Sequence, residues 1–175
     1  MRNVAPITTA RFTMRPLQRS DTAALFPTLS DEEQCQYLTR PAFDSEEELW
    51  GWLAEPGWNG RSWIAEDATG AVVGRFVAVP GHAAGIEEVG YITCIDRQGE
   101  GIASECTHAL IERLFAEDAR KITAEVDTRN MASIALLERL GFTREAHLRE
   151  HDVTHIGLCD VYWYGLLASS RVEGG

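Results

Sequence analysis

The stretch ITCIDRQGEGIASECTHALIERLFAE, residues 92–117, decides the fold, because it joins a hydrophobic strand to an amphipathic helix through a glycine-rich turn. Gly99 and Gly101 let backbone N–H groups approach a ligand closely at the start of the helix. The unsatisfied N–H groups of the first helical turn and the helix dipole favour an anion there. The stretch therefore predicts a phosphate-binding turn, and the plain alternative is a turn that only starts a helix.

Three phosphate-binding motifs can be compared with this turn. A P-loop needs a Lys after its last glycine, whereas Ile102 follows Gly101. The dinucleotide motif G-x-G-x-x-G nearly fits residues 99–104, but too little chain follows for a doubly wound sheet. The pattern Q-x-x-G-x-A is matched in every position by Gln98, Gly101 and Ala103, so this third motif is favoured.

Length, charge and cysteine spacing restrict the class of protein. A chain of 175 residues is expected to form one domain over residues 1–175, with a frayed tail at about 168–175. No apolar run approaches about 18 residues, so no membrane segment is expected. The net charge of −11 argues against nucleic acid as a partner. The four cysteines lack paired spacing, which indicates a reducing, cytoplasmic location.

Acidic and aromatic side chains are concentrated between residues 31 and 63. Residues 31–56 are strongly acidic, with Arg40 as the only basic residue. This indicates either a solvated helix face or a field that attracts a cationic substrate. Most tryptophans here are expected in the core, but one or two are expected to line an acceptor pocket, where an aromatic wall suits an amine. The tryptophans are Trp50, Trp52, Trp58 and Trp63.

Hydrophobic periodicity and turn residues predict the order of the elements. Strands are expected at residues 7–17, 61–66, 71–79, 87–95, 122–127, 143–149 and 160–167. Helices are expected after Ser20, after the capping residues 30–33, after Ser45, at 102–117 and at 131–140. Pro27 is expected to bend or end the first helix. Three strands before the first strand–helix–strand unit imply a mixed sheet.

Two blocks of sequence resemble one superfamily. Residues 98–103 resemble the acyl-coenzyme A pyrophosphate loop of the GNAT acetyltransferases. Residues 130–133 and 136–142 resemble the N-x-x-S…E-K-L-G-F block of the same superfamily. The opening residues 15–21 and the closing residues 160–164 are similar to the branch that includes ribosomal-protein N-terminal alanine and serine acetyltransferases.

The resemblance implies an α/β (α+β) fold, with a mixed, mostly antiparallel, splayed seven-stranded sheet flanked by about four helices. The fourth and fifth strands are expected to part, and the pantetheine arm of acetyl-CoA is expected to enter the gap. Parted strands expose N–H and C=O groups that an amide-bearing ligand can satisfy. The implied cofactor-binding residues are Thr93 on the fourth strand, Gln98, Gly99, Gly101, Ala103 and Ser104 around the pyrophosphate, and Asn130 on the pantetheine side.

The resemblance also implies direct acetyl transfer to a primary amine, either a protein N-terminus or a small cationic amine. The ammonium group must lose a proton, and Glu87 and Glu88 point to opposite faces of the fourth strand. Glu88 is the expected base, because it matches the acid before Val-Gly-Tyr in the ribosomal-protein branch. The alternative is a solvated carboxylate at a strand end. A backbone N–H near Ile92 is expected to donate to the oxyanion.

The general acid departs from the common pattern. Many family members carry a Tyr on the second cofactor-side helix, where this chain has Leu137. The ribosomal-protein branch implies Ser133 as the substitute, although Ser133 could instead only cap its helix. The Leu137 departure leaves a non-catalytic acyl-CoA-binding or sensing module as the main alternative. A nucleotide-binding oxidoreductase is the third interpretation.

His147, His151 and His155 recur every four residues. No cysteine or acid stands at a fitting zinc spacing, so no metal is expected. The resemblance instead places them beside the substrate groove, with plain surface histidines as the alternative. Dimers are common among the proteins that the chain resembles, so a homodimer is one expectation.

Overall fold

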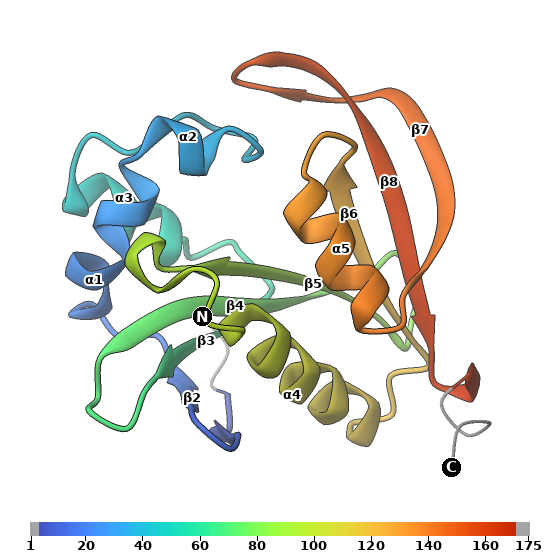
Figure 1. The fold of residues 1–175 in the computed structure, drawn as a ribbon, viewed down its shortest axis with the longest axis horizontal. Helices are drawn as coiled ribbons and strands as arrows, with labels where there is room; N and C mark the ends of the chain where they lie inside the picture. Colours follow the sequence, from blue (N-terminus) through green and yellow to red (C-terminus); the bar gives the residue numbers. More distant parts are fainter. Residues whose placement is uncertain (1–3, 171–175) are drawn as a thin grey trace.

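The computed structural model describes residues 4–170 (Figure 1). Its elements are β1 Ile7–Thr8, β2 Thr13–Pro16, α1 Asp21–Leu29, α2 Glu32–Cys35, α3 Glu46–Leu53, β3 Arg61–Glu66, β4 Val72–Pro80, β5 Ile86–Thr93, the 3-10 helix η1 Ile95–Arg97, α4 Ile102–Ala116, β6 Lys121–Asp127, α5 Met131–Arg139, β7 Thr143–Thr154 and β8 Gly157–Leu167.

The strands form one mixed sheet of eight strands in the order β1-β2-β3-β4-β5-β6-β8-β7. Only the β5–β6 pair is parallel among the described strands, and the other pairs are antiparallel. The sheet has one strand more than the sequence predicted, because residues 7–17 fold back on themselves. Thr9 donates its backbone N–H to Phe12 O at 2.9 Å and closes the turn between β1 and β2.

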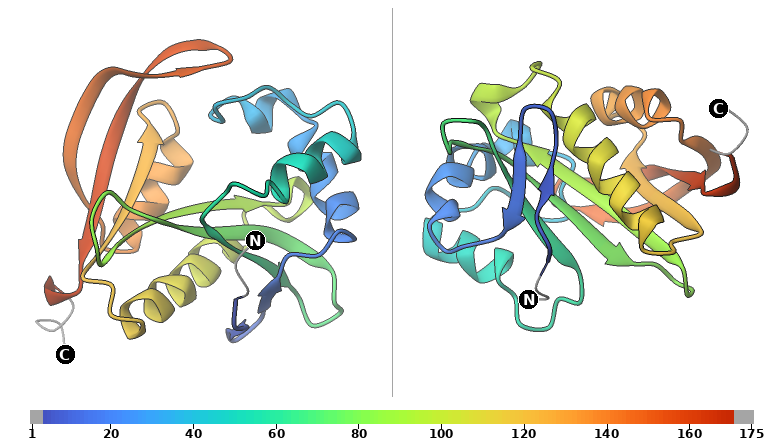
Figure 2. Two further views of the ribbon diagram at one scale, coloured as in Figure 1. Left: turned by 180° about the vertical axis from the view of Figure 1, so that it is seen from behind. Right: turned by 90° about the horizontal axis from the view of Figure 1, so that it is seen from below.

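The sheet splays between β5 and β6, as the resemblance implied. The two strands pair only at Ile86 with Lys121, Glu87 with Ile122 and Glu88 with Thr123. Beyond these pairs β5 and β6 no longer pair with each other. Figures 1 and 2 show β6, β8 and β7 turning away from β3–β5. The facing backbone edges of the rest of β5 and β6 therefore have no strand between them to satisfy their N–H and C=O groups.

Helices cover both faces of β3–β5, with α4 on one side and α1–α3 on the other (Figures 1 and 2). The core under α4 contains Phe76 and Leu110, both fully buried. The second core packs Leu25 of α1 and Leu49 of α3 against Ile64 of β3. Full burial of one such leucine stabilises the fold by about 2 kcal/mol.

Several bounds differ from the prediction for local reasons. The helix α1 continues through Pro27 to Leu29, and the Ser30 backbone N–H closes its last turn on Phe26 O at 2.8 Å. Asp31, rather than Ser30, caps α2 by accepting from the Gln34 backbone N–H.

The chain after α5 forms a longer hairpin than predicted, because β7 and β8 pair almost to the turn at residues 155–156. A frayed tail was predicted at about 168–175. Ala168 donates its backbone N–H to Arg120 O at 3.1 Å, and residues 171–175 lie outside the described residues. No helix in the described part of the chain is long and apolar enough to cross a membrane.

Candidate active site

The glycine turn before α4 has the backbone that the sequence predicted. Gly99 has a φ of +81° and Gly101 a φ of +78°, in the left-handed region that glycine adopts without strain. Glu105 donates the first helical hydrogen bond, to Gly101 O at 3.1 Å. The N–H groups of residues 102–104 therefore have no helical carbonyl to receive them, and they form an anion-binding end together with the helix dipole.

Two arginines hold this turn in place. Arg97 donates to the Glu100 carboxylate at 2.9 and 3.0 Å and to Asp67 at 2.9 Å. Arg11 donates to Glu100 O at 3.0 Å and pairs with Glu105 at 2.7 Å. The Glu100 charge is thus neutralised beside the turn, which leaves the exposed N–H groups as a fitting site for phosphate.

The expected cofactor residues lie along one path at the end of β5. Thr93 is the last residue of β5 and pairs with Gly74 of β4, so its other edge faces the gap. Gln98 donates its side-chain amide to Gln34 Oε1 of α2 at 2.6 Å. Ala103 and Ser104 stand in the first turn of α4. Along the chain, only η1 separates Thr93 from the glycine turn.

A cavity of about 330 Å³ lies where β5 and β6 part. Residues 89–92 of β5 and 124–127 of β6 form two of its walls, and α5 contributes a third. Its remaining lining residues are Tyr37, Leu38, Trp52, Glu55, Trp58, Arg75, Val77 and Val79. The cavity therefore joins the splayed strands to the α2 and α3 side of the molecule.

Glu88 is the last residue of β5 that pairs with β6. Because side chains alternate along a strand, Glu88 lies on the same face as Gly90, which lines the cavity. Burial raises the pKa of Glu88, and the charge of Glu125 raises it further. Glu87 points to the opposite face, where Arg61 lies 3.6 Å from its carboxylate. Neither glutamate itself lines the cavity, but Glu88 shares its face with Gly90 and with its β4 partner Val79, which both do.

Asn130, Ser133 and Leu137 all line the cavity from the α5 side. Asn130 Oδ1 accepts a 3.1 Å hydrogen bond from the Ser133 backbone N–H, which caps α5 as predicted. Burial raises the pKa of Tyr91 of β5, and the nearby Ser133 hydroxyl opposes the increase. Sequence reasoning did not place Tyr91 in the site, because its contact joins elements far apart in the chain.

Arg75 is the second residue that sequence reasoning missed. Its side chain is 6% exposed and lines the cavity beside Trp52 and Trp58, two of the tryptophans considered for a pocket wall. Trp63, in contrast, lies in the core. The only available signal was an arginine among apolar residues in β4, where a lone charge is unexpected.

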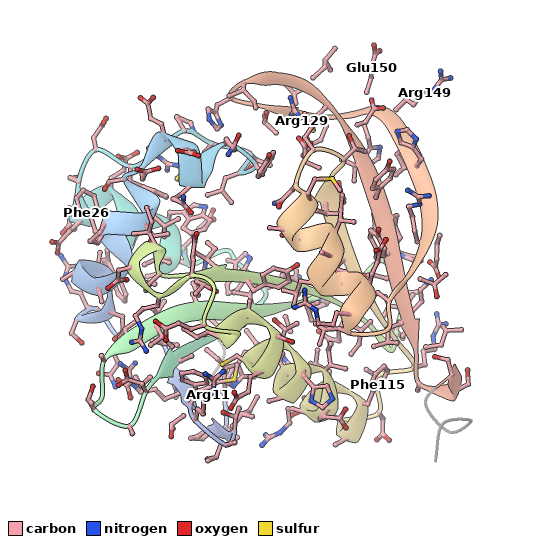
Figure 3. All side chains as sticks on the ribbon, in the orientation of Figure 1. Arg11, Phe26, Phe115, Arg129, Arg149 and Glu150 are labelled. Carbon is pink, nitrogen blue, oxygen red and sulfur yellow. The ribbon has the colours of Figure 1, made fainter. Side chains whose placement is uncertain are left out.

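The loop after β6 and the turn of the β7–β8 hairpin both contact the chain after α2, beside the cavity. Tyr37 donates its hydroxyl to Arg129 O at 3.2 Å, and His155 Nδ1 lies 3.2 Å from Leu38 O. Figure 3 shows Arg129 beneath this hairpin, with Arg149 and Glu150 on the outer side of it.

The three predicted histidines have separate partners. His147 Nε2 lies 2.8 Å from Asp160, and His151 Nε2 lies 3.9 Å from Glu125, a cavity residue. His155 contacts Leu38 in the chain after α2. Within residues 4–170, no group of three or more His, Cys, Asp or Glu side chains is placed to hold a metal ion.

An anion-binding turn, a splayed sheet and a cavity beside a partly buried carboxylate together define a site for a long ligand that carries phosphate and amide groups. The sequence profile of the acetyltransferase (GNAT) domain matches residues 11–143. The chain therefore belongs to the GNAT family and is an acetyl-CoA-dependent N-acetyltransferase. This membership favours the transferase interpretation over the oxidoreductase and the non-catalytic module.

Relatives agree with this assignment. The uncharacterized N-acetyltransferase p20 of Bacillus licheniformis is 30% identical over 168 residues, which cover 91% of this chain and 94% of the relative. A GNAT-family acetyltransferase structure from Bacillus anthracis matches with a TM-score of 0.85 and 22% identity, over 93% of this chain and 98% of that one. The spermidine N-acetyltransferase of Vibrio cholerae, in complex with CoA and spermine, matches with a TM-score of 0.79 and 22% identity, over 92% and 98% of the two chains.

Proposed function

We propose that this enzyme transfers an acetyl group directly from acetyl-CoA to a primary amine bound in the cavity between β5 and β6. The observation that carries the proposal is Glu88, a partly buried acid with a raised pKa, at the point where the two strands part. A base of raised pKa accepts a proton from an ammonium group more readily than an ordinary carboxylate does.

The cysteines support transfer without a covalent enzyme intermediate. All four are buried, and none lines the cavity of the described structure. Burial raises the pKa of Cys94 to about 11 and that of Cys106 to about 12, so both remain protonated at neutral pH. The thiolate is the nucleophilic form, so these side chains are poor acyl acceptors.

The cofactor is assigned to the chain's own donors. The N–H groups of residues 102–104, with Gly99, Gly101 and Gln98 beside them, hold the pyrophosphate. The free edge of β5 near Thr93 pairs with the pantetheine amides. Asn130 uses Oδ1 to cap α5, and its Nδ2 group is assigned to the pantetheine side.

Each catalytic residue has one assigned role. Glu88, acting through water, takes the proton that the ammonium group releases before the amine attacks. A backbone N–H of β5 that faces the gap, that of Tyr91, donates to the acyl oxygen. The N–H of Ile92 itself points to β4, because Cys94, two residues further on, donates to Val73 O at 3.0 Å. Acetyl-CoA supplies the acetyl group as a thioester, whose carbon–sulfur bond breaks while the carbon–nitrogen bond forms. Ser133, which lies near Tyr91, donates to the departing sulfur.

Two acceptor classes agree with the resemblances. The ribosomal-protein branch acetylates protein N-termini, and one similar structure is a spermidine N-acetyltransferase. The acidic region 31–56 offers a weaker field for cations than its sequence suggests. Glu47 pairs with Arg19 and Glu48 with Arg40, and of the acids in this region only Glu55 lines the cavity. Peptide N-termini and small amines therefore both belong in the assay.

The test is acetyl-CoA-dependent thiol release with a chromogenic thiol reagent, against small amines and short peptides. Glu88→Gln and Ser133→Ala should each lower kcat, by about 100-fold for the base. Glu87→Gln is the matched control, because it removes the neighbouring acid from the opposite face. Normal kcat in both active-site variants would remove the catalytic assignments. Absence of release with every amine would contradict the proposed activity.

A further inference from the structure

Arg75 carries a buried charge that no acid neutralises. Its side chain is 6% exposed, and its Nε atom donates to the Ser62 hydroxyl at 3.0 Å. Burial lowers the pKa of Arg75 to about 10, so the guanidinium remains charged at neutral pH. No carboxylate among residues 4–170 pairs with it. A buried charge without a counter-ion is costly, so it points to a ligand that supplies one.

Arg15 provides the comparison within the same chain. It lies in β2, is more exposed than Arg75, and binds two carboxylates, Asp21 at 2.6 Å and Glu66 at 2.5 Å. The fold thus pairs a partly buried arginine fully, yet leaves the most buried one unpaired. The difference is that Arg75 lines the cavity.

Two tryptophans fix the guanidinium in that position. The Arg75 Cζ atom lies 5.0 Å from the ring centroid of Trp52 and 5.3 Å from that of Trp58. Their π faces stabilise the cation but offer no hydrogen-bond acceptor. The terminal N–H groups of the guanidinium therefore remain available as donors at the cavity wall. Their forked arrangement binds a carboxylate through two parallel hydrogen bonds.

The strand register places this fork near the assigned chemistry. Arg75 stands opposite Ile92 of β5, and its contact with Ser62 draws the side chain toward β3, at the level of Val77. Ser62 pairs with Val77, which in turn pairs with Gly90, two residues from Glu88. Two residues of a strand span roughly 7 Å and two strand spacings roughly 10 Å, so the backbone positions of Ser62 and Glu88 lie roughly 12 Å apart. The long side chains of Arg75 and Glu88 reach into this distance, and a compact molecule together with the water assigned to Glu88 can span the rest, from the cationic end at Arg75 to the acidic end at Glu88.

We propose that the acceptor is a compact amino carboxylate, whose carboxylate binds Arg75 while its amine faces Glu88. This inference rests on the proposed function and names its substrate class. The acidic end suits the ammonium group, and Arg75 disfavours a second positive charge, as in a polyamine. A peptide N-terminus has a neutral amide where the carboxylate would be.

The experiment compares matched amines with the full-length protein. The probes are the standard α-amino acids and β-alanine, each beside its carboxamide, with spermidine added. The best carboxylate should exceed its amide in kcat/KM by at least about tenfold. Arg75→Met should lower kcat/KM for that carboxylate by about 100-fold, the effect of removing one partner of a buried charge pair. It should leave the amide within about threefold, and Arg75→Lys should fall between.

Arg61→Met is the matched control, because Arg61 also lies over a tryptophan ring, at 5.4 Å, but outside the cavity. The inference is overturned if amides or spermidine are the better acceptors, or if Arg75→Met slows all acceptors equally. Failure of the proposed function looks different, since no amine would be acetylated by the wild-type enzyme. In that case calorimetry of the amino acids with the CoA-saturated protein decides. Binding lost in Arg75→Met supports the inference, and absence of binding overturns it.

Discussion

The negative charge of Glu125 raises the pKa of Glu88 across the point where β5 and β6 part. Burial is the larger cause for Glu88, and burial also raises the pKa of Glu125. His151, 3.9 Å from Glu125, opposes the latter increase when it is charged. The two carboxyl groups are therefore coupled, in that the ionised Glu125 makes ionisation of Glu88 less favourable.

The activity should depend on this coupling. Because only the carboxylate form of Glu88 accepts a proton, kcat/KM should rise with pH through its raised pKa. Glu125→Gln removes the neighbouring charge, so the rising limb should move to lower pH. Glu88→Gln should abolish it. The measurement is kcat/KM from about pH 5 to about pH 9. If the rising limb of the pH profile were unchanged in Glu88→Gln, the base would have to be another residue.

The same shift predicts that Glu88 destabilises the folded state at neutral pH. Its folded pKa lies above the unfolded value, so the folded protein holds the proton more tightly. Stability falls as the pH rises from the unfolded pKa through the folded pKa, and the loss is complete above both. Glu88→Gln should therefore raise the melting temperature at about pH 8 and change it little at about pH 4. Glu87→Gln, on the opposite face, should not reproduce this pH-dependent gain.

Gly101→Ala should weaken both the fold and cofactor binding. At a φ of +78°, an alanine costs about 1 to 2 kcal/mol of unfolding free energy. Relief of this strain would move the N–H groups before α4, so the Kd for CoA should rise about tenfold. Gly141→Ala is the control, because Gly141 has a φ of +87° at the far end of α5. It should lose similar stability in urea unfolding but keep its CoA affinity in calorimetry.

Arg15→Met should be strongly destabilising, because Asp21 is 2% exposed and would lose its main counter-ion. Its remaining hydrogen bond, from the Gln18 backbone N–H at 2.7 Å, does not neutralise the charge. Removing one partner of such a pair costs about 3 kcal/mol. Arg19→Met breaks an exposed pair with Glu47 and should cost less than about 1 kcal/mol. Urea unfolding compares the two, and equal losses would contradict the argument.

Features of the fold that depend on local sequence were predicted well. The glycine turn, the Asn130 cap and the Gly141 terminus of α5 each follow from residues within a few positions of one another. The extra strand was missed, because a hairpin and a single strand have the same alternation. Of the two effects expected of Pro27, an end of the helix at that residue does not occur, because tertiary packing of α1 outweighs the local penalty.

Features of the site that depend on distant contacts were predicted less well. The period of two places Glu87 and Glu88 on opposite faces of β5, but it does not say which face borders the site, and the choice of Glu88 came from the resemblance. Arg75 could not be singled out, since its meaning depends on two tryptophans that approach from α3 and the following loop. The pattern of residues within one strand does not predict whether other elements will supply a carboxylate to pair with a buried arginine of that strand.

The proximity of Tyr91 and Ser133 should be visible as non-additivity of their substitutions. If Ser133 donates to the departing sulfur while Tyr91 orients its hydroxyl, Tyr91→Phe acts only through Ser133. Ser133→Ala should lower kcat by about 10- to 100-fold and Tyr91→Phe by less, with the double variant no slower than Ser133→Ala alone. Single-turnover rates with saturating acetyl-CoA measure the step directly. Additive effects would mean that the two hydroxyls act independently, and unchanged rates in all three would leave the sulfur without a donor from α5.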